Sequence, residues 1–235
     1  MSTKNSIGVI GSNGYVGKQF CNILEKTKFD YTKITRENYD TFKNKNSFSH
    51  VINCAMPSGR FWAKNNPQSD FQETVKKTFD IKINFSESKI IQISSISARV
   101  QLNTVYGRHK RAAELLLDPE KDLIIRLGPI YDCSMEKGAL IDIIHGKKVF
   151  VSGDTKYAFT PLEWACQEII NMRDKTGIIE LGSKNYILLK DLRDKLESDS
   201  EFEGFIDDQI FPEANEKCPD AREVIKFAKQ LAGLK

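Results

Sequence analysis

The chain has 235 residues, 40% of them hydrophobic and 29% charged, and its formal net charge at pH 7 is +3. Such a chain can bury a sizeable core, as one large α/β domain or as one domain with a small appendage. The near-balanced charge, without a long basic run, gives little support to a nucleic-acid or membrane-surface partner. A polar amino terminus and the absence of any apolar run near ~18 residues predict neither a signal peptide nor a membrane span.

The cysteines and histidines predict a cytoplasmic protein without a bound metal. Five cysteines and three histidines are scattered along the chain, and none of them has the spacing of a zinc site or of a disulfide framework. We therefore expect reduced thiols in a cytosolic environment.

The first predicted element is a buried strand, Ile7–Ile10, that runs into the glycine-rich turn 11–17 and then into a helix, Lys18–Lys26. Glycines at these spacings allow a tight turn and let backbone N–H groups approach a pyrophosphate, and a helix N-terminus favours phosphate charge. Glycine turns without a ligand also occur, but this one follows a first strand, as the motif requires. We expect a dinucleotide to bind at this turn, which contains Gly11, Asn13, Gly14, Tyr15, Val16 and Gly17.

The end of the second predicted strand, Tyr31–Thr35, favours NADP(H) over NAD(H). An NAD-selective site needs a carboxylate here for the ribose hydroxyls, whereas an arginine accommodates a 2′-phosphate. Arg36 follows the strand directly, with Glu37 beside it. Arg36 is therefore the predicted phosphate ligand, and the alternative is an ordinary surface charge.

The segment from Ile90 to Lys110 has the pattern of a redox or proton-transfer site. A predicted strand, Ile90–Ile93, stops at a serine pair that includes Ser95, and Tyr106 and Lys110 follow four residues apart. On one helix this spacing places both side chains on the same face. A free tyrosine titrates near ~10, and a nearby ammonium lowers that pKa. Tyr106 is thus the predicted acid/base, and Lys110 is predicted to lower its pKa. Ser95 is predicted to donate a hydrogen bond to a carbonyl oxygen of the substrate. The alternative is a packed tyrosine, a solvated lysine and serines that only end the strand.

The other segments predict an α/β fold of the Rossmann type, a doubly wound parallel sheet. Further strands are expected at 50–55 and 123–126 and helices at 68–83 and 108–117, with a loop at 56–66. Beyond them we expect helices at 137–146, 161–172, 189–196 and 220–232 and strands at 149–152 and 178–182. The apolar stripe of the last helix favours core packing, with a homodimer contact as the alternative. We expect a dinucleotide-binding body over residues 1–132 and a small C-terminal substrate-binding region over 133–235.

Six motifs follow one another along the chain and together indicate a family. They are G-x-x-G-x-x-G at 11–17, Asn-Cys-Ala at 53–55, Ser-Ser at 94–95, Tyr-Gly-Arg-His-Lys at 106–110, Arg-Leu-Gly-Pro-Ile-Tyr at 126–131, and the segment 152–165. In this order they resemble the extended short-chain dehydrogenase/reductases, which are NAD(P)-dependent sugar-nucleotide epimerases, dehydratases and 4-keto-reductases. The resemblance covers residues 7–196.

The resemblance implies a role for each matching position. The glycine turn would bind the pyrophosphate, Arg36 the 2′-phosphate, Cys54 and Ala55 would line the cofactor, and Pro129 and Ile130 would flank the carboxamide. The implied catalytic residues are Ser95, Tyr106 and Lys110, with Lys110 also holding the nicotinamide ribose. Lys156 stands where the family has an arginine that binds the substrate diphosphate, and a solvated lysine is the alternative there.

Three departures from the family pattern narrow the expected reaction. The family's S-T-D-E is Ser-Ser-Ile-Ser at 94–97, which lacks the dehydrating carboxylates. Only 11 positions separate Ser95 from Tyr106, and Asp70 stands where an asparagine is common. The sequence thus predicts an NAD(P)-dependent oxidoreductase or epimerase acting on a sugar nucleotide or a similar carbonyl/hydroxyl substrate. The alternative is a non-catalytic NADP(H)-binding sensor or interaction protein, which would not need all three catalytic residues.

Overall fold

A computed structural model of the chain describes residues 6–45, 47–212 and 216–233. The chain divides into two compact units, the first formed by Met1–Leu127 with Cys166–Ile179 and the second by Gly128–Ala165 with Glu180–Lys235. Among the described residues, no helix is both long and apolar enough to cross a membrane.

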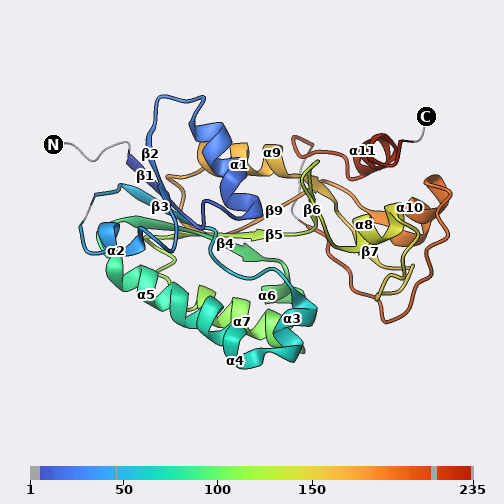
Figure 1. Cartoon of the computed structure of the whole chain (residues 1–235), viewed down its shortest axis with the longest axis horizontal. Coiled ribbons are helices and arrows are strands. Elements are labelled where there is room, and N and C mark those ends of the chain that lie inside the picture. The colour runs from blue at the N-terminus through green and yellow to red at the C-terminus, as the bar shows by residue number, and fades with distance from the viewer. Residues whose placement is uncertain (1–5, 46, 213–215, 234–235) are drawn as a thin grey trace. The chain divides into compact units, whose positions relative to one another are not determined.

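A six-stranded sheet with the order β2-β1-β3-β4-β5-β9 organises the first unit (Figure 1). Its strands are β1 (Ser6–Ile10), β2 (Asp30–Ile34), β3 (His50–Asn53), β4 (Lys89–Ser95), β5 (Leu123–Leu127) and β9 (Gly177–Leu181), whose last two residues are assigned to the second unit. The four pairings from β2 to β5 are parallel. The predicted doubly wound α/β fold is confirmed. The order reverses between β1 and β3, and ligands of such sheets bind outside the carboxyl ends of the strands at this switch point.

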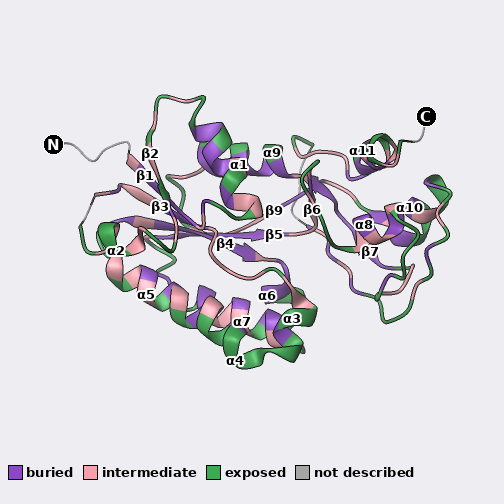
Figure 2. Cartoon of the chain, viewed as in Figure 1, coloured by how far each residue is buried: buried purple, intermediate pink, exposed green. Residues whose placement is uncertain are grey.

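The central strands are apolar because helices cover both faces of the sheet. All five residues of β5 are buried, as are five of the seven in β4. Helix α1 (Tyr15–Leu24) lies on one face, and α5 (Lys77–Asn84) and α7 (Val105–Glu114) lie on the other (Figure 1). Figure 2 shows the buried strands between helices whose outer sides are exposed. Near-continuous hydrophobic strands are typical of parallel sheets enclosed in this way.

The two helices that flank the predicted site both begin three residues earlier than the sequence pattern indicated. Helix α1 starts directly after Gly14, whose extended backbone forms the N-cap. Helix α7 starts after Thr104, whose Oγ1 accepts a hydrogen bond of 3.0 Å from the Gly107 N–H. A hydroxyl N-cap of this kind satisfies one of the free amides of the first turn.

The segment between β3 and β4 is more helical than expected. Residues predicted as a loop contain α3 (Arg60–Asn65). The predicted crossover helix is present as α4 (Pro67–Phe71), a π-helical turn η1 (Gln72–Lys76) and α5. A further short helix, α6 (Ser97–Val100), precedes α7.

The second unit has its own small core. The helices of this unit are α8 (Ala139–Ile144), α10 (Leu189–Lys195), α11 (Glu223–Leu231) and the start of α9 (Leu162–Asn171). Its strands form two pairs, β6 (Ile130–Tyr131) with β8 (Thr160–Pro161) and β7 (Lys156–Tyr157) with β10 (Ile187–Leu188). Of the predicted apolar stripe of α11, Val224 is buried in this core and Ile225 and Phe227 pack against it, whereas Leu231 is 42% exposed. The strand expected at 149–152 is wrong, because Val149 makes only an isolated bridge to Phe202.

Candidate functional site

The glycine turn lies at the switch point of the sheet. Gly11 has φ = +78°, and a Cβ added there would stand 2.9 Å from the Ala55 backbone. The Cys54 N–H donates to the Ile10 carbonyl at 2.9 Å, which holds the ends of β1 and β3 together. Gly11 is therefore fixed as glycine both by its left-handed backbone and by the close approach of the neighbouring strand.

A cavity of about 940 Å³ opens beside this turn. Its walls come from four segments: the glycine turn, the loop after β2, the loop after β3, and the helical stretch η1–α5. Of the predicted cofactor residues, those that line it are Gly11, Asn13, Gly14, Arg36, Cys54 and Ala55. Tyr15, Val16 and Gly17 form the first turn of α1 and are not among the residues that line the cavity.

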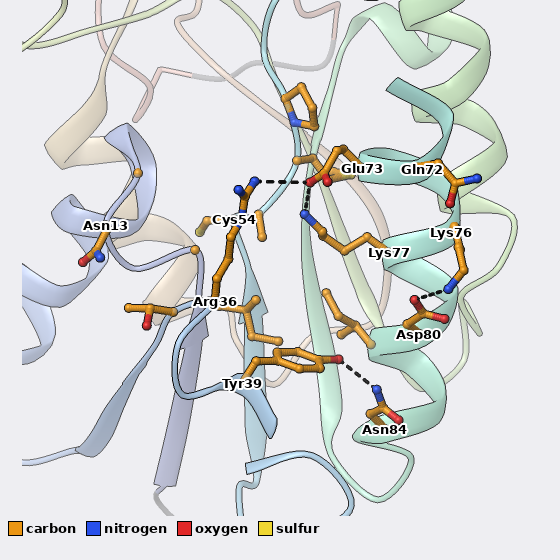
Figure 3. A pocket seen from close by; sticks show the side chains of 18 of the residues that line it. Asn13, Arg36, Tyr39, Cys54, Gln72, Glu73, Lys76, Lys77, Asp80 and Asn84 are labelled. Atoms are coloured by element: carbon orange, nitrogen blue, oxygen red, sulfur yellow. Dashed lines mark hydrogen bonds and ion pairs between the residues drawn. The ribbon is translucent and has the colours of Figure 1, made fainter. Parts of the chain in front are cut away.

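Charged side chains face one another across this cavity (Figure 3). The Arg36 guanidinium lies 3.6 Å from Oε2 of Glu73, on the π-helical turn, and the same oxygen contacts the Lys77 ammonium. Lys76 pairs with Asp80 at 2.6 Å. The sequence motifs gave no indication that Glu73 pairs with Arg36, because Glu73 lies 37 positions further along the chain.

Ser95 and Tyr106 lie together at the end of β4. Ser95 is the last residue of that strand, and its Oγ accepts a hydrogen bond of 3.2 Å from the Ser97 N–H. The side chains of Ser95 and Tyr106 are hydrogen-bonded to each other. Tyr106 is 6% exposed. The carboxyl end of β4 thus carries a serine and a tyrosine hydroxyl in one hydrogen-bonded pair.

Lys110 lies one helical turn beyond Tyr106 on α7, as the spacing predicted. Its Nζ is 5.2 Å from the centroid of the Tyr106 ring. The lysine is 3% exposed, and burial lowers its pKa to about 7, against the charges of Asp70 and Glu114, which raise it. Near neutral pH this lysine therefore changes its charge.

The expected lowering of the Tyr106 pKa is wrong. Burial raises the pKa of Tyr106 to about 12, while the hydrogen bond to Ser95 and the charge of Arg60 act in the opposite direction. Removing the phenolate from water costs more than these interactions return. Tyr106 consequently holds its proton at neutral pH.

The buried Asp70 pairs with the partly buried His109 near these residues. Oδ2 of Asp70 lies 2.6 Å from Nδ1 of His109, and the aspartate is fully buried. Its other oxygen, Oδ1, has no hydrogen-bond partner among the described residues. The charge of Asp70 acts on both Tyr106 and Lys110. The departure from asparagine at this position therefore places a carboxylate in the electrostatic environment of the site.

The remaining predicted site residues belong to the second unit. Ile130 pairs with Thr160 in the β6–β8 ladder, and the Pro129 carbonyl accepts from the Thr160 N–H at 2.9 Å. The Lys156 ammonium lies 5.1 Å from the centroid of the Tyr186 ring, a cation–π contact. The structure thus groups the glycine turn, Arg36 and the Ser95–Tyr106–Lys110 set in one unit, and Pro129, Ile130 and Lys156 in the other.

Comparisons with known proteins show the fold. No family model and no curated protein matches the sequence. The structure is similar to a dTDP-4-dehydrorhamnose reductase of Bacillus anthracis solved with NADP (TM-score 0.76, 14% identity, 97% of this chain and 98% of that one). It is also similar to an NAD-dependent NDP-hexosamine 5,6-dehydratase of tunicamycin biosynthesis (0.80, 12%, 97% and 97%) and to the UDP-glucose 4-epimerase of Thermotoga maritima solved with UDP-glucose (0.75, 14%, 97% and 97%).

Proposed function

We propose that this protein is an NAD(P)-dependent oxidoreductase or epimerase acting on a sugar nucleotide or a similar carbonyl/hydroxyl substrate. Its fold is shared with a reductase and an epimerase of nucleotide sugars. The observation that carries the proposal is the hydrogen-bonded Ser95–Tyr106 pair, with Lys110 against the tyrosine ring, at the carboxyl end of a central parallel strand. We propose that Ser95, Tyr106 and Lys110 are the catalytic residues.

The first unit has the features needed to bind a dinucleotide. The left-handed Gly11 and the N-terminus of α1 are suited to a pyrophosphate, since helix N-termini present free N–H groups and a positive dipole end. The adjoining cavity of about 940 Å³ contains Arg36, which we assign to the 2′-phosphate of NADP(H). Among the similar structures, the reductase was solved with NADP, and the dehydratase is NAD-dependent. We propose NADP(H) as the preferred cofactor.

The catalytic set supports reduction of a carbonyl. When bound, the nicotinamide supplies the hydride for the carbonyl carbon. Tyr106 holds a proton at neutral pH and donates it to the carbonyl oxygen, which becomes the hydroxyl of the product. Ser95 donates a hydrogen bond to the same oxygen and stabilises the charge that develops there. Lys110 sets the electrostatic potential at the tyrosine and binds the nicotinamide ribose. If the same site oxidises a hydroxyl and then reduces the resulting carbonyl at the same carbon, the overall reaction is an epimerisation.

We propose residues 1–132 as the dinucleotide-binding body and residues 133–235 as the substrate-binding region. We propose that Lys156 contacts the diphosphate of the substrate. We propose that Pro129 and Ile130 flank the nicotinamide carboxamide. Lys156 presents a single ammonium, which attracts a diphosphate but does not provide the paired donors of an arginine.

A binding titration tests the cofactor assignment. The purified protein is titrated with NADPH, NADH and their oxidised forms, followed by fluorescence. We expect tight NADPH binding that weakens roughly 5- to 10-fold in Arg36→Ala, because one cation is lost from the phosphate, and little change for NADH. Binding of none of the four dinucleotides would mean that the glycine turn is structural, and the enzymatic proposal would be abandoned.

A further inference from the structure

The cavity beside the glycine turn contains an arrangement that the sequence motifs did not predict: a carboxylate set between two cations. Oε2 of Glu73 is shared by the Arg36 guanidinium from the loop after β2 and the Lys77 ammonium from the helix opposite (Figure 3). Glu73 lies on η1, a turn of π-helix inserted between two α-helices. π-Helical turns occur frequently at functional sites, where they redirect side chains.

The exposures of the three side chains show that this arrangement is open to a ligand. Arg36 is 87% exposed, Glu73 38% and Lys77 26%. An ion pair that remains in contact with water contributes little to stability, so a ligand anion can replace the carboxylate at small cost. The neighbouring cations are already neutralised by other carboxylates, Lys76 by Asp80 and Lys43 by Asp40.

We propose that Glu73 and Lys77 set the selectivity of this site between phosphorylated and unphosphorylated adenosine ribose. This inference rests on the proposed cofactor site. Lys77 is a second cation for the 2′-phosphate, on the wall opposite Arg36. When NADP(H) binds, the 2′-phosphate displaces the Glu73 carboxylate from both cations. When the ribose lacks that phosphate, the same carboxylate accepts hydrogen bonds from the ribose hydroxyls.

The charges explain why Glu73 disfavours a phosphorylated ribose and favours an unphosphorylated one. A phosphate monoester carries about −1.5 to −2 charge at pH 7, so a carboxylate left beside it is repelled, whereas two cations attract it. A ribose hydroxyl is neutral and donates well to a carboxylate. NAD-selective sites of this fold class obtain such a carboxylate from the end of the second strand. Here Arg36 follows that strand and the carboxylate projects from the opposite wall.

The test uses cofactor fragments, so that it depends on the adenosine end alone. Calorimetric titrations with adenosine 2′,5′-bisphosphate and with 5′-ADP are made on the wild type, Glu73→Gln and Lys77→Gln. Glu87→Gln is the matched control, since it removes the same charge from an exposed residue outside the cavity.

We expect Glu73→Gln to bind the bisphosphate roughly 3- to 10-fold more tightly and 5′-ADP no more tightly, with the gain shrinking at high salt. Lys77→Gln is expected to bind the bisphosphate weaker by a similar factor. Equal changes in Glu73→Gln and Glu87→Gln, or an unchanged preference between the two ligands in both cavity variants, would overturn the inference. If Glu73→Gln does not fold, Lys77→Gln tests the same role from the other side of the ion pair.

Failure of this inference can be distinguished from failure of the proposed function. A wild type that binds NADPH and reduces a substrate, but whose ligand preference is unaffected by the cavity variants, refutes only the selectivity role. A wild type that binds neither dinucleotides nor the bisphosphate refutes both.

Discussion

The ammonium of Lys110 lies 5.2 Å from the centre of the Tyr106 ring, one turn further along the same helix, and both residues are buried. Burial acts on the two groups in a complementary way. It raises the pKa of Tyr106 to about 12 and lowers that of Lys110 to about 7, because each neutral form is favoured away from water. At neutral pH the tyrosine holds its proton while the lysine titrates.

The lowered pKa of Lys110 predicts how stability depends on pH. Between about pH 7 and 10.5 the unfolded chain binds a proton at Lys110 that the folded chain has lost, so the free energy of unfolding rises with pH. Lys110→Met removes this dependence. The difference between the wild type and Lys110→Met, measured by urea unfolding, should therefore change in favour of the wild type by up to about 1.4 kcal/mol per pH unit across this window. A flat difference would show that Lys110 stays charged in the folded protein.

Gly107 allows the helix that carries Tyr106 to approach the preceding turn. A Cβ at this position would lie 2.1 Å from the Gln101 carbonyl oxygen and 2.7 Å from that of Ser97. Gly107→Ala should displace the start of α7, reduce the free energy of unfolding by roughly 1–3 kcal/mol and lower turnover. Arg108→Ala on the exposed side of the same helix is the control. Retention of full stability in Gly107→Ala would mean that α6 and α7 are not packed as closely as these distances require.

Glu114 anchors the other end of α7 to the sheet. Its carboxylate, 2% exposed, accepts hydrogen bonds from Nε and Nη2 of Arg126 at 2.9 and 2.7 Å and from Oγ of Ser94 at 2.7 Å. Breaking a buried, bidentate pair leaves an uncompensated charge, so Glu114→Gln should destabilise the protein by roughly 3–5 kcal/mol. The exposed Glu120→Gln should have little effect. Similar urea midpoints for the two variants would contradict this role.

Much of the fold was predictable because the central strands are apolar runs. β1, β4 and β5 are buried on both faces and fall where the sequence indicated. Helix α3 was missed because Pro57, Gly59 and Pro67 indicate a loop, whereas Arg60–Asn65 is helical where it packs against α7. The strand expected at 149–152 is absent because Val149 and Val151 pack in the second core without a continuous partner strand.

The candidate site was predictable where it depends on local spacing and not where it depends on tertiary contacts. The four-residue interval correctly placed Tyr106 and Lys110 on one helical face. The direction of the Tyr106 pKa was wrong, since it depends on burial that no spacing reveals. The contact of Arg36 with Glu73 joins segments far apart in the sequence, so local spacing could not predict it.

The most direct test of the proposed chemistry is the turnover of Tyr106→Phe. With NADPH and a set of 4-keto sugar nucleotides, the loss of reduced nicotinamide absorbance is followed for the wild type, Tyr106→Phe and the control Tyr31→Phe, which lies outside the cavity and the Ser95–Tyr106 pair. We expect kcat to fall by roughly 10²–10⁴-fold in Tyr106→Phe, the usual contribution of a positioned acid, with NADPH affinity unchanged. Turnover of Tyr106→Phe at the wild-type rate on a confirmed substrate would contradict the account.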